Sequence, residues 1–222
     1  MANVFAPFGF KQQTSATGAP SNFQMIYKQI AYDNNTPIYT GDPVKLLNTG
    51  YIAQWTAATA VSQLAGIFAG CEFLSTLTGK IESSPKWPGS GVVASTAQSS
   101  IVAKIIPCNL AIPSTFLVQA ANASITDVTG VTFEDVGENI DVALGTGNAT
   151  TGISGAYIDL NTLGTTATLP FRIVGLYGGL PGAGGAMGIQ PGTSGPYGGS
   201  ALAAFNYALV TANVSGAGST GI

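Results

Sequence analysis

Histidine is absent from the 222 residues, and this absence restricts the possible chemistry of the chain more than any other feature of its composition. Histidine is the usual general base, the commonest zinc and iron ligand, and the partner of the nucleophilic serine or cysteine in many hydrolases. Most familiar hydrolase mechanisms are therefore excluded. The sequence predicts a protein that is not an enzyme.

Charged residues are also scarce, at 8% of the chain, whereas an ordinary soluble domain contains about 25%. The seven Lys and Arg residues are scattered between Lys11 and Arg172 and form no basic stripe that would neutralise a run of phosphates. We therefore expect no direct contact with nucleic acid. A surface solvated mainly by uncharged polar groups should adhere readily to other proteins.

Uninterrupted apolar runs are missing as well. The uncharged stretches Leu46–Cys71 and 173–222 are broken by polar residues or Gly, which argues against a membrane-spanning helix. The first eight residues lack the basic start and the apolar core of a secretory signal, so we expect folding in a cytoplasm. Cys71 and Cys108 have no metal-type spacing, and we expect them to be buried thiols.

The chain does contain short segments rich in β-branched and aromatic residues, separated by turns with Gly, Pro or Asn. This pattern predicts a mainly β fold, a single β-sandwich or barrel-like domain with at most one or two short helices. We expect a helix within Thr126–Ile140 and a long surface loop over Ser75–Ser100. We expect Leu64–Leu74 to be a buried strand with a bulge or a close backbone approach at its glycines. The expected divisions are an extended N-terminal arm (1–22), a β-rich core (23–177), a Gly/Pro-rich loop (178–200), a final strand (201–214) and a flexible tail (215–222).

Aromatic residues supply the candidate interface. Trp55 is expected in the core, whereas Trp87 lies among Pro and Gly and is expected at a surface contact. The phenylalanines near the N-terminus would each cost about 1.5–3 kcal/mol to leave in water. That segment should therefore dock, either on the core of its own chain or on the sheet edge of a neighbouring subunit. The hypothetical interface residues are Phe5, Phe8, Phe10, Trp87 and Tyr197.

No motif in the chain specifies a cofactor or a metal. The acidic cluster of Glu134, Asp135, Glu138 and Asp141 does not match a calcium-loop pattern, and a solvated acidic turn explains it better than a weak divalent-ion site. The glycine-rich run 182–188 misses the spacing of phosphate-binding loops. We therefore predict no catalytic residues, no cofactor and no metal ligands.

Several short motifs nevertheless follow one another in a recognisable order. They are Pro7-Phe8-Gly9-Phe10, Gly41-Asp42-Pro43-Val44, the segment 66–73, Trp87-Pro88-Gly89, Asp135-Val136-Gly137, Thr151-Gly152-Ile153-Ser154-Gly155, Asp159, the segment 165–169, and Arg172-Ile173-Val174-Gly175. In this order they resemble the capsid decoration, or cement, proteins of tailed bacteriophages. The likeness covers about residues 5–177, and the segment 178–200 departs from the family pattern.

The resemblance implies a β-rich protein that binds the major capsid protein on the outer face of the shell, usually as a homo-oligomer, and ties neighbouring capsomers together. It would be made in the cytoplasm of the host bacterium and end in the virion. The resemblance supplies no catalytic residues. Two alternatives stay open: a structural component of a phage tail or fibre, and a glycan-binding β-sandwich module, which exposed Trp and Tyr side chains would favour. Among enzymes, a glycosidase that uses a carboxylate pair with Glu134 or Glu138 is the one class compatible with the residue inventory, and it ranks last.

Overall fold

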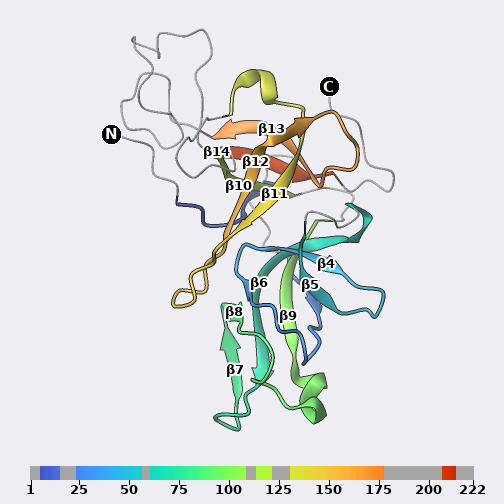
Figure 1. The fold of residues 1–222 in the computed structure, drawn as a ribbon, viewed down its shortest axis with the longest axis vertical. Helices are drawn as coiled ribbons and strands as arrows, with labels where there is room; N and C mark the ends of the chain where they lie inside the picture. Colours follow the sequence, from blue (N-terminus) through green and yellow to red (C-terminus); the bar gives the residue numbers. More distant parts are fainter. Residues whose placement is uncertain are drawn as a thin grey trace.

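The computed structural model of the protein describes residues 6–15, 24–56, 61–108, 114–121, 131–177 and 207–213. The fold is mainly β, as the sequence predicts. The molecule is elongated, with one six-stranded sheet in the upper half of Figure 1 and a second in the lower half. We call these the upper sheet and the lower sheet. The helical elements of the described residues are short 3₁₀ helices at Val61–Gln63, Ser95–Ser100 and Phe133–Asp135.

Five strands of the upper sheet form a closed ring. The path runs β10–β12–β11–β13–β14, and β14 pairs back with β10. β12 pairs with β10 through Ala120 and Ala121, which leaves the first part of that edge of β10 for another strand. β1 lies outside the ring and pairs with β10 along the edge opposite β14. The strands are β1 (Lys11–Ser15), β10 (Ser114–Ala121), β11 (Asn139–Gly145), β12 (Gly155–Gly164), β13 (Phe171–Tyr177) and β14 (Tyr207–Ala212).

The interior of the ring is filled by alternate residues of its strands. Successive side chains of a strand point to opposite faces of the sheet, so every second residue faces inward. Trp55, Leu64 and Ile67, which come from the lower sheet and its connections, belong to the same hydrophobic cluster. The prediction that Trp55 lies in the core is confirmed. The inward residues of the ring are Phe116, Val118, Ala120, Ile140, Val142, Ala156, Ile158, Phe171, Ile173, Ala208, Val210 and Ala212.

The lower sheet follows the path β2–β9–β6–β4–β5, with β7 added on β6. Its two ends also meet, because Ile30, just after β2, forms a bridge with Ile52 of β5. A separate two-stranded sheet joins β3 and β8. The strands are β2 (Ile26–Lys28), β4 (Pro43–Leu46), β5 (Ile52–Gln54), β6 (Leu64–Leu74), β7 (Ile81–Ser84) and β9 (Val102–Pro107), with β3 (Ile38–Tyr39) and β8 (Lys86–Trp87) beside them.

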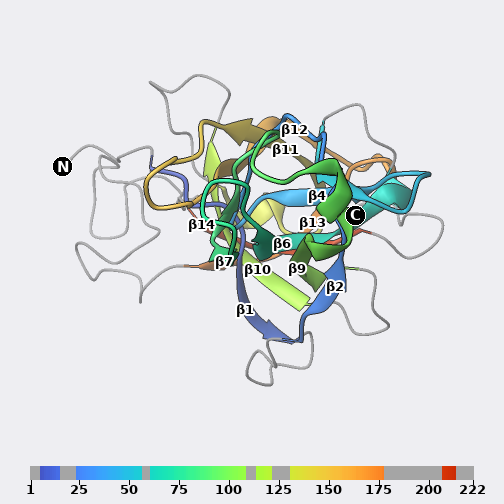
Figure 2. The same ribbon diagram turned by 90° about the horizontal axis from the view of Figure 1, so that it is seen from below.

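The long strand β6 contributes to both hydrophobic clusters. Leu64 and Ile67 belong to the cluster of the upper ring, whereas Phe68, Cys71 and Phe73 belong to the cluster of the lower sheet. Figure 2, which looks along the long axis from below, shows the lower sheet in front of the upper one. The two halves are therefore packed end to end and share a strand.

Of two expectations about local structure, the one for Ser75–Ser100 is wrong and the one for Thr126–Ile140 is confirmed in part. The expected loop Ser75–Ser100 contains β7, β8 and a 3₁₀ helix. Its polarity arises because β7 is a solvated outer strand and not because regular structure ends. The expected short helix within Thr126–Ile140 is present as the 3₁₀ helix Phe133–Asp135, and the last two residues of that range instead begin β11, whose alternation directs Ile140 and Val142 into the ring. The part 122–130 lies outside the described residues.

The C-terminal expectations are tested in part. β14 lies within the expected final strand 201–214. The Gly/Pro-rich loop 178–200 and the tail 215–222 lie outside the described residues. Within the residues that the structure describes, no helix is long and apolar enough to cross a membrane.

Candidate functional site

Trp87, expected at a surface contact, lies in the core of the lower sheet, and this prediction is wrong. Its side chain is 0% exposed. Its indole N–H donates to the backbone oxygen of Asn34 at 3.0 Å, and its ring meets Phe73 edge-on with centroids 5.7 Å apart. Pro88 and Gly89 follow the short strand β8 directly, so they mark its end and not an exposed loop.

The two described phenylalanines near the N-terminus, Phe8 and Phe10, dock on their own chain, which is the first of the two alternatives. Phe10 is 3% exposed and belongs to the core of the ring. It stacks on Phe171 with ring centroids 4.6 Å apart and meets Phe116 edge-on at 6.3 Å. Phe8 is half-buried and stacks on Tyr207 at 5.7 Å. Phe10 is therefore a core residue and unavailable to a neighbouring subunit.

The remaining interface residues of the sequence hypothesis, Phe5 and Tyr197, lie outside the described residues. Of the five hypothetical interface residues, Phe8 is the one that the structure describes as accessible at all. The candidate site must therefore be sought among side chains that the sequence did not single out.

The most elaborate polar arrangement of the described residues surrounds Asp42, which is 2% exposed. One carboxylate oxygen accepts the hydroxyl of Ser154, from the loop before β12. The other oxygen accepts the backbone N–H of Tyr39 at 2.8 Å and the side-chain amide of Gln54, in β5, also at 2.8 Å. Both oxygens are thus occupied by donors from three separate parts of the chain.

Backbone hydrogen bonds complete this arrangement. The N–H of Phe10 donates to the oxygen of Gly41 at 2.9 Å, and the N–H of Gly41 donates to Phe68 in β6 at 2.8 Å. The N–H of Ser154 donates to Thr40 at 2.9 Å. We call Gly9, Phe10, Thr40, Gly41, Asp42, Gln54, Phe68 and Ser154 the Asp42 joint. It ties the N-terminal segment, the lower sheet and the β11–β12 hairpin of the upper sheet together.

The chemistry of the Asp42 joint is structural. Burial raises the pKa of the Asp42 carboxyl above its usual value of 3.8, and the hydrogen bonds from Ser154, Tyr39 and Gln54 partly oppose that rise. The Ser154 hydroxyl donates to Asp42 and accepts the N–H of Ala156 at 2.8 Å, and it is buried. A nucleophile needs a base and access to a substrate, whereas this serine is 2% exposed and its carboxylate partner already accepts two further hydrogen bonds.

Comparison with protein-family models, curated proteins and solved structures found no match to this chain.

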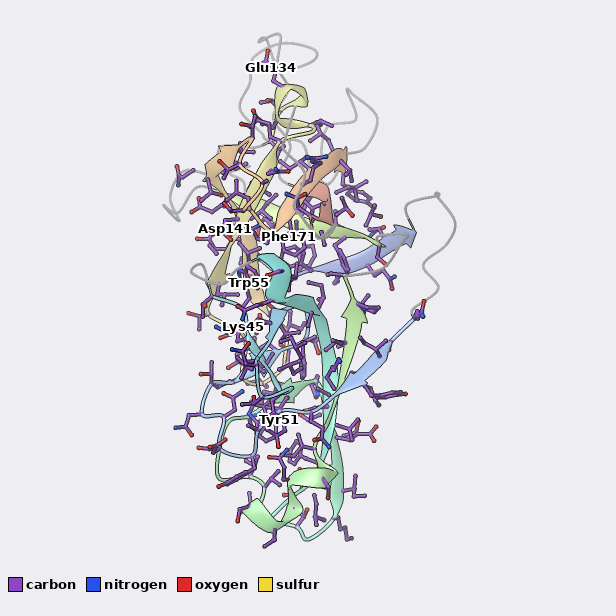
Figure 3. All side chains as sticks on the ribbon, turned by 90° about the vertical axis from the view of Figure 1, so that its right-hand side faces the viewer. Lys45, Tyr51, Trp55, Glu134, Asp141 and Phe171 are labelled. Carbon is purple, nitrogen blue, oxygen red and sulfur yellow. The ribbon has the colours of Figure 1, made fainter. Side chains whose placement is uncertain are left out.

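The acidic cluster foreseen from the sequence is not assembled into a metal site. Glu134 lies at one end of the molecule, far from Asp141, which lies beside the middle (Figure 3). Asp135 accepts the N–H and the hydroxyl of Thr132, at 2.6 and 3.0 Å, and so closes a local turn. Among the residues that the structure describes, no group of three or more His, Cys, Asp or Glu side chains is placed to hold a metal ion.

The two cysteines are buried and unpaired, as the sequence predicts. Burial raises the pKa of the Cys71 thiol to about 12, with a smaller contribution from the nearby Glu72 carboxylate. Burial also raises the pKa of Cys108. Because the thiolate is the reactive form, both side chains are inert at neutral pH.

Exposed apolar side chains gather instead on the lower sheet. Leu74 and Ile81 are cross-strand partners in the β6–β7 hairpin, and Ile81 is 72% exposed. Leu77, in the turn between them, is 88% exposed. Tyr27 of β2, on the other side of β9, is 66% exposed. Sequence reasoning missed this hairpin, although the Leu77-Thr78-Gly79-Lys80 turn between two short runs was a usable signal.

Proposed function

We propose that this chain is a structural protein of a tailed-phage virion, which binds the outer surface of the capsid and reinforces the contacts between capsomers. The proposal rests on the ordered set of motifs that resembles the decoration proteins. Three of those motifs, around Gly9, Gly41 and Ser154, meet in the Asp42 joint. Meeting in space is what motifs far apart in the sequence should do if they record a common fold.

The proposed partner is the major capsid protein, bound by many copies of this chain. An interface of this kind would rest on apolar burial and small polar contacts, because the chain has few charges to contribute. The exposed Tyr27 of β2 is suited to such contacts. Many copies on one lattice also relax the affinity required of each contact, since linked contacts add avidity.

A catalytic role is not part of this proposal. The chain has no histidine, and the buried serine and carboxylate of the Asp42 joint hold each other in place. What the proposed function requires of the molecule is a rigid body with a fixed surface, and the two packed clusters and the joint between them would provide it.

Salt dependence tests the nature of the interface. Shells that lack the chain would be saturated with purified protein, then washed at NaCl concentrations from low to molar, and the bound copies counted by quantitative gel densitometry. Screening weakens contacts between exposed charges but leaves apolar burial intact. We expect occupancy to change little across the series. Complete release at molar NaCl contradicts this account of the interface.

Location in the virion tests the function itself. Immunogold labelling of intact particles, with a tail-protein antibody as the matched control, should place the label over the whole head surface. Label confined to the tail or its fibres would replace the proposal by a tail role, and absence of label from particles would end it.

A further inference from the structure

The strand β7 is an open edge beside the main path of the lower sheet. The upper ring is closed by the β10–β14 pairing, and the two ends of the lower sheet are joined beside β2 by the single Ile30–Ile52 bridge. Among the described strands of these two sheets, β1 and β7 lie outside the closed paths, and each has one neighbour. An open edge presents unpaired N–H and C=O groups to any extended chain that approaches it.

The two outer strands differ in how well they are protected. β1 is polar throughout, with the sequence Lys-Gln-Gln-Thr-Ser, and its pairing with β10 shifts register after Gln12. Polar side chains and bulges are the usual devices that keep an edge from pairing. β7 pairs with β6 in unbroken register and presents the exposed Ile81. β7 is also polar apart from Ile81, but its unbroken register makes it the more regular of the two edges for a partner to pair with.

The hydrogen bonds of the hairpin fix which backbone groups of β7 face outward. The N–H of Ser75 donates to Lys80 at 2.9 Å, so this pair is hydrogen-bonded. Hydrogen-bonded and non-hydrogen-bonded pairs alternate along an antiparallel ladder, so Leu74 and Ile81 form a non-hydrogen-bonded pair. The hydrogen bond of the Leu74 N–H agrees with this assignment, because this N–H donates to the hydroxyl oxygen of Ser100, on the side of β6 away from β7. The N–H and C=O of Ile81, and by the same alternation those of Ser83, point outward.

We propose that β7 pairs antiparallel with β7 of a second copy of this chain about a two-fold axis, with Ile81 opposite Ile81. In that register each Lys80 lies opposite Glu82 of the other copy, so two pairs of opposite charges face each other across the axis. Both Ile81 residues would exchange their outward N–H and C=O groups. The partner that pairs with β7 is thus a second copy of this chain, because the charges of Lys80 and Glu82 are complementary in this register.

Neighbouring registers are less favourable. Centring the pair on Glu82 places two glutamates directly opposite each other, and like charges at that position are destabilising. Centring it on Ser83 places Pro85 opposite Ile81. Proline has no N–H to donate, and the Pro85 oxygen already accepts the N–H of Thr40 at 3.1 Å. The Ile81-centred register avoids both conflicts.

The dimer rests on one short strand from each copy, with the exposed Leu74 and Leu77 beside it. Interfaces far below about 1,200 Å² are weak, so we expect a dissociation constant of about 10 μM to 1 mM. The proposal does not depend on the virion role, and it is tested on the free full-length chain. Its failure therefore says nothing about capsid binding.

Charge exchange is the first test. Sedimentation equilibrium at rising concentration should show a monomer–dimer equilibrium for the natural chain. Lys80→Glu or Glu82→Lys alone places like charges opposite each other twice per dimer, and each should weaken association about tenfold. The double variant K80E/E82K restores opposite charges and should recover the original constant. Lys11→Glu, on the other outer strand, is the control and should leave association unchanged.

A loss of charge complementarity can be distinguished from a loss of folding. Thermal melts of each variant show whether it is folded, and recovery in the double variant argues that a single variant failed through charge and not through unfolding. A chain that stays monomeric at about 1 mM overturns the proposal. A dimer whose dissociation constant is unchanged by both single substitutions also overturns it. So does a double variant whose dissociation constant does not return to that of the natural chain.

Cross-linking is the second test. The two natural cysteines are buried, so a cysteine introduced by Ile81→Cys would be the reactive thiol under mild oxidation. Opposed residues of a hydrogen-bonded pair have Cα atoms about 5.5 Å apart, within the range that a disulfide spans. We expect a covalent dimer from Ile81→Cys and none from the exposed control Ser99→Cys. Equal cross-linking of both, or of neither, overturns the proposed register.

Discussion

At the scale of single residues, environment and not local composition decided where side chains lie. Both tryptophans are buried, although Trp87 has Pro and Gly neighbours that suggest a loop. The contact between Asp42 and Ser154 joins residues 112 positions apart. Their motifs were visible in the sequence, but nothing local indicates that they meet. The sequence therefore predicts the character of such residues better than their partners.

Asp42→Asn should destabilise the fold by about 1–3 kcal/mol, because the amide nitrogen cannot accept a hydrogen bond that the carboxylate accepted. The free energy of unfolding from urea titrations would measure the loss. Asp33→Asn, at an exposed turn position, is the matched control and should change stability by less than about 0.5 kcal/mol. Equal effects of the two substitutions would show that the Asp42 joint contributes nothing to stability.

The same carboxyl should make stability depend on pH. Its pKa is raised in the folded state above 3.8, so the folded chain holds this proton more tightly than the unfolded chain does. The resulting stabilisation is present in full below pH 3.8 and is lost as pH rises through the folded-state pKa. Burial raises the pKa of Asp141 as well, so this carboxyl also stabilises the folded chain more at low pH than at high pH. The urea midpoint of Asp42→Asn, measured across the acidic range, should therefore vary less with pH than that of the natural chain.

At the scale of elements, periodicity and glycine were good guides where a strand is buried. The expectation of a bulge or a close approach in Leu64–Leu74 is confirmed by a register shift between Phe68 and Gly70. A Cβ at Gly66 would also meet the Ile106 oxygen at 2.3 Å. The β6–β7 hairpin was missed because an outer strand needs no apolar alternation. A polar strand and a polar loop have the same composition.

A comparison of two glycines with similar backbone angles separates the free-energy cost of a strained backbone from the cost of overpacking. Gly9 and Gly50 have φ values of +75° and +87°. A Cβ at Gly9 would lie 2.6 Å from the Cβ of Ser154, whereas nothing lies within 4 Å at Gly50. Gly50→Ala should cost about 1–2 kcal/mol. Gly9→Ala should cost about 1–3 kcal/mol more, because it also overpacks the Asp42 joint. Differential scanning calorimetry would give both values, and equal melting temperatures would contradict the close approach.

At the scale of the whole molecule, the shared strand β6 should make the two halves unfold together. The two tryptophans report on different clusters, since Trp55 belongs to the upper one and Trp87 to the lower one. Trp87→Phe leaves Trp55 as the fluorescent probe, and Trp55→Phe leaves Trp87. In each variant, the fluorescence and far-UV circular dichroism midpoints in denaturant should coincide. A fluorescence transition that precedes or follows the backbone transition would show that one half melts alone.

The symmetry of an Ile81-centred pair limits how many chains can associate through β7. Pairing about a two-fold axis uses the same edge of both copies, so the association is complete at two chains and offers no site to a third. Open-ended stacking of strands, the route to fibrils, needs an edge left over after each addition. Of the described strands of the two sheets, β1 is then the outer strand left over, and its register shift opposes further pairing, so dimers can be packed at high density without polymerising.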